Sequence, residues 1–189
     1  RQANVSVAMN EAGQVIGDRL RGGLDSTLID GADAWFFDGS TTRRLGLYEA
    51  EHSFAGSIQY NTSRLMNASG RVVGHATRFH EDLGPNGTSA WYFDGFDTFQ
   101  IGLTGDDFTG AYGEQTNIAD HLNAAGQVTG FAFRDGAYDR GSNAWFYDPA
   151  RKKTYDLGST FASLSGYAES SVRFLGDDGL VLGEDLLFD

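Results

Sequence analysis

The chain has 189 residues, a formal net charge of −12 and no cysteine. This charge repels phosphate backbones, so nucleic acid is not an expected partner, and the lack of cysteine excludes a disulfide scaffold, thiol catalysis and cysteine metal sites. No run of roughly 18 apolar residues occurs, so no transmembrane segment is predicted. The 26 glycines, against two prolines, indicate many tight turns rather than long helices.

The first recognisable element is a turn motif of the form Asn-x-x-Gly, which recurs along the chain. It occupies Asn10–Gly13, Asn67–Gly70 and Asn123–Gly126, and a degenerate fourth copy ends at Gly179. The glycines of the successive copies lie 57, 56 and 53 residues apart. Because Asn and Gly tolerate positive φ, each copy predicts a tight turn between two antiparallel strands, which we call strands a and b.

The second element is an Ala-Trp-aromatic-aromatic-Asp block, which predicts a further strand, c. It occupies residues 34–38, 90–94 and 144–148 and contains all the tryptophans of the chain: Trp35, Trp91 and Trp145. Both faces of this strand are apolar, since side chains alternate along a strand, and such a strand is buried between two layers. We therefore expect the three tryptophans to be equivalent and mostly buried in the core, rather than to form a sugar-stacking platform.

The third element is a short Leu-Gly turn that ends a strand d after each aromatic block. Its copies are Leu45–Leu47, Ile101–Leu103 and Leu157–Ser159. The blocks together predict an all-β fold of tandem four-stranded repeats of about 55 residues, propeller-like, partial or open, with about 3.5 units. A β-trefoil-like fold is the alternative. We expect one repeat domain over 1–189, with units at about 3–47, 57–103 and 113–158 and a half unit at 166–188.

These blocks resemble the bacterial extracellular HAF-type repeat. The matching residues are Ala34 to Asp38, Leu45-Gly46 and the hairpin Leu65 to Gly74, followed by the corresponding blocks of the next unit. The resemblance covers nearly the whole chain. It implies export and a propeller-like fold, and it implies no enzymatic activity, because this family has no motif of catalytic residues.

The side chains that could carry catalysis or bind a metal form no recognised motif. The four histidines, His52, His75, His80 and His121, form no metal-binding pair and are expected at the surface or in turns. The carboxylate pairs Asp106-Asp107 and Asp177-Asp178 are expected to splay onto opposite faces of a strand, which does not suit a glycosidase. No nucleophile elbow or phosphate-binding loop occurs. We therefore expect no enzyme, no catalytic residue, no cofactor and no metal site.

Acidic residues gather between the predicted strands b and c, where they could bind Ca²⁺ or form a solvated rim. They are Asp25, Asp30, Asp33, Glu81, Asp82, Asp135 and Asp139. No loop has EF-hand spacing, and the loops differ in pattern, so the solvated rim is the favoured interpretation. Four Asn-x-Ser/Thr sequons begin at Asn4, Asn61, Asn67 and Asn86, and they matter only if a glycosylating cell exports the chain.

The sequence favours a non-catalytic bacterial module outside the cytoplasm: secreted, periplasmic or on the cell surface. Its expected role is structural or in protein interaction, for example as an accessory subunit of a larger surface or membrane-associated assembly. A carbohydrate- or calcium-binding lectin-like module is the alternative, and an enzyme with its site in a groove between units is a third hypothesis. The ligand-binding residues and the oligomeric state are not predicted.

The two chain ends favour association with other protein chains. The last hairpin ends with the apolar segment Leu186-Leu187-Phe188, and the first hairpin carries Val5, Val7, Val15 and Ile16 into strands expected to lack c and d partners. Exposed apolar patches and open strand edges invite association. We therefore expect at least one terminal hairpin to contact another chain, identical or different, or a further part of this one.

Overall fold

The structure, a computed structural model, describes residues 2–22, 29–136, 140–158 and 168–187. The regular elements of these residues are strands and short 3-10 turns, which confirms the predicted all-β class. The chain divides into two compact units, each described by itself below: unit 1 comprises Arg1–Pro85 and Ala90–Gln100, and unit 2 comprises Asn86–Ser89 and Ile101–Asp189. Within the described ranges, no helix is long and apolar enough to cross a membrane.

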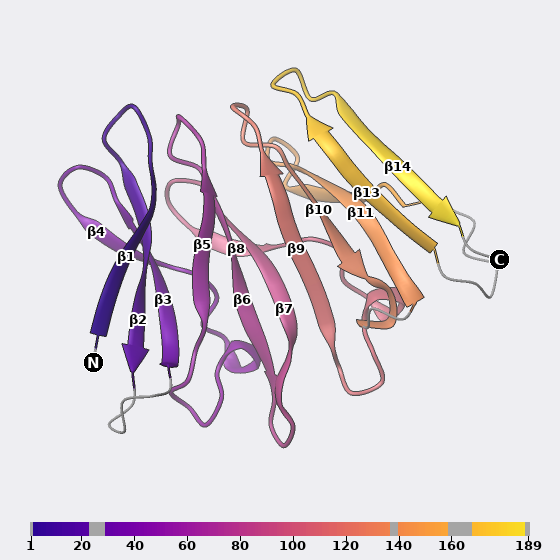
Figure 1. The fold of residues 1–189 in the computed structure, drawn as a ribbon, viewed down its shortest axis with the longest axis horizontal. Coiled ribbons are helices and arrows are strands. Elements are labelled where there is room, and N and C mark those ends of the chain that lie inside the picture. The colour runs from indigo at the N-terminus through magenta and orange to yellow at the C-terminus, as the bar shows by residue number, and fades with distance from the viewer. Residues whose placement is uncertain (1, 23–28, 137–139, 159–167, 188–189) are drawn as a thin grey trace. The chain divides into compact units, whose positions relative to one another are not determined.

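Unit 1 begins with an antiparallel sheet of four strands in chain order (Figure 1). Its strands are β1 (Gln2–Met9), β2 (Val15–Gly22), β3 (Ile29–Phe37) and β4 (Thr42–Leu45). The pairing of β2 with β3 runs from Val15 opposite Phe37 to Gly22 opposite Ile29. The first hairpin therefore has its own c and d strands, and the expectation that it lacks them is wrong. The sheet is called the first sheet from here on.

The next four strands repeat this order. They are β5 (Asn61–Met66), β6 (Val72–His80), β7 (Gly84–Phe93) and β8 (Thr98–Ile101). β6 lies between β5 and β7, and β8 pairs with β7. The segment between β4 and β5 contains a 3-10 turn, η1 (Ala50–His52), and a parallel bridge joins Ala32 of β3 to Tyr60 just before β5. The predicted strands a to d are thus present in two successive sets.

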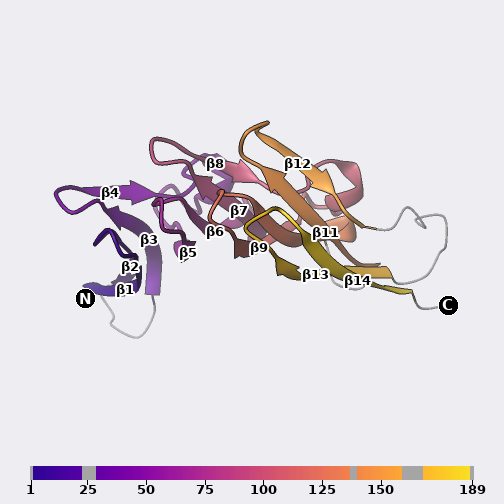
Figure 2. The same ribbon diagram turned by 90° about the horizontal axis from the view of Figure 1, so that it is seen from above.

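Unit 2 contains a third set and one further hairpin (Figures 1 and 2). Its strands are β9 (Gln115–Leu122), β10 (Val128–Phe133), β11 (Gly141–Asp148), β12 (Lys153–Asp156), β13 (Ala168–Leu175) and β14 (Val181–Leu187). Two 3-10 turns also occur here, η2 (Asp106–Phe108) and η3 (Arg134–Gly136). β11 pairs with β12 through Trp145 to Asp148, and through Gly141 and Ser142 it pairs in parallel with β13.

The Asn-x-x-Gly motifs form the predicted turns. The glycines between strands a and b have positive φ: 77° at Gly13, 77° at Gly70, 82° at Gly126 and 84° at Gly179. In the first copy the backbone N–H of Gly13 donates to the Asn10 carbonyl, at 3.0 Å. The Asn10 side-chain oxygen also accepts a hydrogen bond from the Gln14 backbone N–H, at 3.0 Å. Both the position and the backbone conformation of these turns are confirmed.

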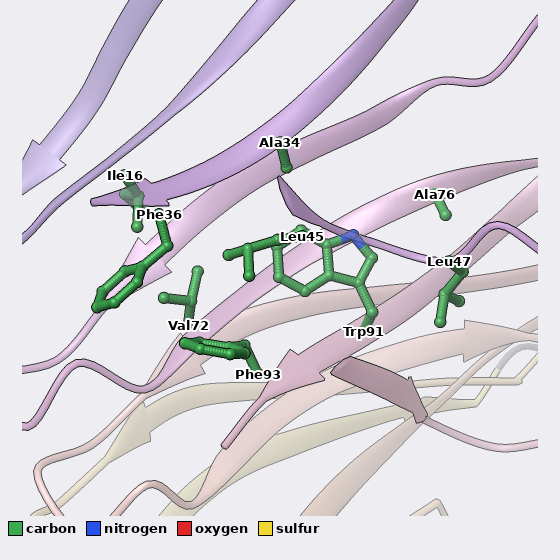
Figure 3. Close-up of a cluster of buried hydrophobic side chains, with 9 residues drawn as sticks. All are labelled: Ile16, Ala34, Phe36, Leu45, Leu47, Val72, Ala76, Trp91 and Phe93. Atoms are coloured by element: carbon green, nitrogen blue, oxygen red, sulfur yellow. The ribbon is translucent and has the colours of Figure 1, made fainter. Parts of the chain in front are cut away.

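The core of unit 1 is built around Trp91 (Figure 3). The buried cluster consists of Ile16, Ala34, Phe36, Leu45, Leu47, Val72, Ala76, Trp91 and Phe93. The indole lies over Gly74 of strand b, so closely that a Cβ on this glycine would be 2.2 Å from the Trp91 ring. Trp145 covers Gly130 and Trp35 covers Gly17 in the same way. A glycine is therefore required beneath each tryptophan.

A buried asparagine joins strand a to the Leu-Gly turn that precedes it. Asn61 Oδ1 accepts a hydrogen bond from the Leu47 N–H at 2.8 Å, and Asn61 Nδ2 donates to the Leu47 carbonyl at 3.0 Å. In unit 2, Asn117 makes the same two bonds to Leu103, at 2.7 and 2.8 Å. Asn4 occupies the equivalent position in β1 and is exposed.

Candidate binding groove on the first sheet

One face of the first sheet carries a groove with a volume of about 810 Å³. Side chains two residues apart on a strand share a face, and this rule brings the lining residues together from four strands. The polar and aromatic ones used below are Asn4 of β1, Arg19 and Arg21 of β2, Asp33 and Trp35 of β3 and Arg44 of β4. The sequence did not identify this constellation.

Three arginines surround one carboxylate in the groove. The side chain of Asp33 is only 9% exposed, and its Oδ1 accepts hydrogen bonds from Arg44 Nη2 at 2.5 Å and Arg44 Nε at 3.1 Å. Its Oδ2 lies 3.3 Å from Arg21 Nε and 3.6 Å from Arg19 Nη2. Since one carboxylate faces three guanidinium groups, the cluster keeps an excess of positive charge in a chain whose net charge is −12.

Arg44 is held in place from several directions. Its Nη2 also donates to Gln59 Oε1 at 2.9 Å, and its guanidinium lies 3.7 Å from the centre of the Tyr48 ring. The Tyr48 hydroxyl donates to the Leu45 carbonyl at 2.5 Å, and burial raises the pKa of Tyr48 to about 12. Tyr48 therefore remains a neutral phenol at ordinary pH, and Arg44 is positioned before any ligand binds.

Trp35 forms the aromatic part of the groove. Trp91 and Trp145 are fully buried, as predicted, whereas Trp35 is half-buried. Trp35 and Trp91 occupy equivalent positions in the repeat. The sheet face that carries Trp91 is covered by Ala34 and Leu45 of the first sheet. The face of the first sheet that carries Trp35 forms the groove instead.

The groove also departs from the repeat in its residue types. Two residues after the glycine beneath the tryptophan, strand b carries Ala76 in the second set and Ala132 in the third, and both are fully buried. The first sheet has Arg19 at this position, and its side chain is 46% exposed. An arginine in place of a buried alanine suits a face that contacts water or a polar partner.

The candidates for Ca²⁺ binding that the structure describes, Asp33, Glu81, Asp82 and Asp135, do not form a common site. Asp33 lies within β3, in the arginine cluster, rather than in a solvated rim between strands b and c. Glu81 and Asp82 are exposed in the turn after β6, and Asp135 of η3 pairs with Arg140 at 3.3 Å. Asp25 and Asp139 lie outside the described residues, as does the side chain of Asp30.

The two carboxylate pairs are exposed and are not on strands, contrary to expectation. Asp106 and Asp107 belong to η2, which follows Gly105 with a φ of 112°. Asp177 and Asp178 lie in the turn between β13 and β14, where Asp177 Oδ1 accepts a hydrogen bond from the Ala124 backbone N–H at 2.9 Å. Within the described ranges, no group of three or more His, Asp or Glu side chains could hold a metal ion.

The histidines lie apart from the groove. His52 of η1 is buried, with Nδ1 3.5 Å from Glu49 Oε2, so it lies in a turn, as one of the two expected positions, but not at the surface. His75 and His121 are half-buried on strands, and His80 lies at the end of β6. Of the sequon asparagines, Asn61 and Asn67 are buried, Asn86 is half-buried and Asn4 is exposed beside the groove.

His52 should make stability depend on pH. Burial lowers the pKa of His52 below its usual 6.5, with a further contribution from Arg78, although Glu51 and Glu49 oppose the shift. A lowered pKa means that the unfolded chain binds the proton more readily, so this contribution to stability is complete above about pH 6.5 and is lost as the pH falls towards the folded-state pKa. Denaturant unfolding across this range should show the loss. This loss of stability at low pH should be smaller in His52→Gln than in the unmodified chain, and it should be unchanged in His80→Gln. Equal pH profiles of stability for all three proteins would contradict the role of His52.

No protein-family model and no curated protein matches this sequence. Among solved structures, the chain is similar to a fucose lectin from Kordia zhangzhouensis, whose structure was determined in complex with methyl-fucoside. The two chains are 18% identical, and the match covers 84% of this chain and 99% of the lectin chain with a TM-score of 0.39. A TM-score this low does not establish a common fold.

Proposed function

We propose that this chain is a non-catalytic interaction module that acts outside the cytoplasm and binds carboxylate groups of a partner protein in the groove of the first sheet. The observation that carries the proposal is the cluster of Arg19, Arg21 and Arg44 that lines the open groove, in which Arg19 takes the place of a buried alanine of the other sets. Guanidinium groups bind carboxylates through paired hydrogen bonds. The resemblance to HAF-type repeats supports a place outside the cytoplasm.

A titration with a short glutamate oligomer tests the proposal. Because Trp91 and Trp145 are fully buried and Trp35 is not, a change in fluorescence or in acrylamide quenching on binding should report mainly on Trp35. Binding should weaken as salt is added, since the interaction is between exposed charges. Arg19→Ala, which restores the residue type of the other repeats, should reduce the affinity about tenfold, or about 1.4 kcal/mol.

Arg43→Ala is the matched control for this experiment. Arg43 is also exposed on β4 and carries the same charge, but it precedes Arg44 and therefore faces the other side of the strand. It should leave the affinity unchanged. Equal weakening by the two substitutions would indicate a general charge effect, and no binding by the unmodified chain would refute the proposal.

A carbohydrate-binding role for the same groove is the second candidate. It is favoured by the half-buried Trp35, because an indole with a free face can stack on a sugar ring while Asn4 and the arginines donate hydrogen bonds. A panel of neutral and carboxylate-bearing glycans separates the two roles. Binding of neutral glycans that Trp35→Ala abolishes, with no binding of the glutamate oligomer, would favour this candidate.

A further inference from the structure

A second cavity, of about 270 Å³, lies beside the last hairpin of unit 2. It is lined by residues of β11, of β13 and of β14 together with Leu157: Ala144, Leu157, Ser170, Ser171, Val172, Val181, Gly183, Glu184 and Asp185. Most of these side chains are apolar or small. The cavity is called the C-terminal slot below, and it is separate from the groove of the first sheet, which belongs to unit 1.

The walls of the C-terminal slot correspond to the surroundings of Trp91 in unit 1. By the repeat spacing, Ala144, Leu157, Val181 and Gly183 are equivalent to Ala34, Leu45, Val72 and Gly74. The first three of the latter set belong to the buried cluster that contains Trp91, and the Trp91 indole covers Gly74 (Figure 3). In the described residues of the last hairpin no such indole is present, and Val181 is only half-buried where Val72 is fully buried.

The strand edge beside the slot is also open. In the three complete sets, strand b pairs with strand c, as β2 pairs with β3 and β10 with β11. In the part of the chain that the structure describes, β14 pairs only with β13. The opposite face of β14 also lacks a covering layer, because Leu182 is 54% exposed while its equivalent Ile16 is 0% exposed. An open edge of this kind is a template for an added strand.

We propose that the C-terminal slot and the edge of β14 accept an extended tryptophan-bearing segment of a partner, which pairs antiparallel with β14 and places its indole over Gly183. The segment has the small-Trp-aromatic pattern of strand c, since that pattern fills the equivalent places in the complete sets. A second folded copy does not supply the segment, because its c strands are already paired on both edges, as β3 is by β2 and β4.

The test appends a copy of residues 141–158 after Asp189 through a flexible glycine-serine linker. This copy contains the Trp145 strand β11 and its partner β12, and the linker raises its effective concentration near β14. The backbone amides of β14 should exchange with solvent at least about tenfold more slowly than in the parent chain, because an added strand protects them. The midpoint of thermal unfolding should also rise.

Two controls distinguish slot binding from a general effect of the tail. Trp145→Ala within the appended copy leaves the parent chain unaltered and should remove most of the protection of β14. Val172→Phe in β13 fills the slot from within and should prevent binding of the unmodified tail. Equal protection by the Trp and Ala tails, or protection by neither, would overturn the proposal whether or not Val172→Phe folds.

Discussion

Trp91→Ala should lower the free energy of unfolding by about 3–5 kcal/mol, the range typical of large aromatic side chains removed from a core that cannot collapse. Trp91 is fully buried among Ala34, Leu45 and Val72 in unit 1. Its removal leaves a cavity, and two of its walls belong to β3 and β6, which are held by backbone pairing on both edges, so little relaxation is expected. Urea denaturation monitored by far-UV circular dichroism measures the change.

Trp35→Ala is the matched control for Trp91→Ala. Both indoles cover a glycine of strand b, Gly17 and Gly74, so the local geometry is the same. Trp35 is half-buried and borders the open groove, so its removal leaves a space that water can enter rather than an enclosed cavity like the one left by Trp91→Ala. We expect a clearly smaller loss of stability. Similar losses for the two variants would show that the first sheet is more completely covered than its groove indicates.

Asn61→Ala should produce the second large loss of folding stability. It removes both partners of the Leu47 backbone, so a buried N–H and a buried carbonyl lose their hydrogen bonds at about 1–3 kcal/mol for each group. Thermal unfolding by calorimetry measures the loss. Asn61→Asp, which keeps an acceptor for the Leu47 N–H but loses the donor, should also destabilise the protein.

Asn4→Ala is the control for the asparagine position. Asn4 stands at the equivalent place in β1 but is exposed, and a substitution at an exposed position away from such contacts changes stability by about 0.5 kcal/mol or less. If Asn4→Ala destabilised the chain as strongly as Asn61→Ala, the asparagine would act through its own strand rather than through the Leu-Gly turn.

The repeat itself could be predicted from the sequence because its signals are local. An Asn-x-x-Gly turn needs only its own four residues, and the alternation along Ala90 to Phe93 shows directly that both faces of the strand are apolar. These features were confirmed by the positive φ of Gly70 and by the complete burial of Trp91. The propeller-like arrangement and the role of the chain ends remain predictions.

The features that were missed depend on tertiary contacts or on segments outside the repeat. His52 lies in η1, between two repeat sets, where no periodicity shows which side chains are buried. Asp33 was assigned to a loop because β3 begins earlier than the aromatic block indicates. Arg19, one member of the arginine cluster, could have been found by aligning the repeats, since it stands where the other sets have Ala76 and Ala132. That signal becomes informative only when the uncovered face is known.

The divided edge of β11 sets a limit on the length of the strand beside it. β13 occupies this edge at Gly141 and Ser142, and β12 occupies it from Trp145 onward. Extending β12 by two or three residues along β11 would bring it into collision with β13. The strands β4, β8 and β12 each have four residues. In unit 2, therefore, the first strand of the last hairpin, β13, limits the length of β12, the last strand of the preceding set. Insertions into the repeat are expected to accumulate in its turns rather than in β12.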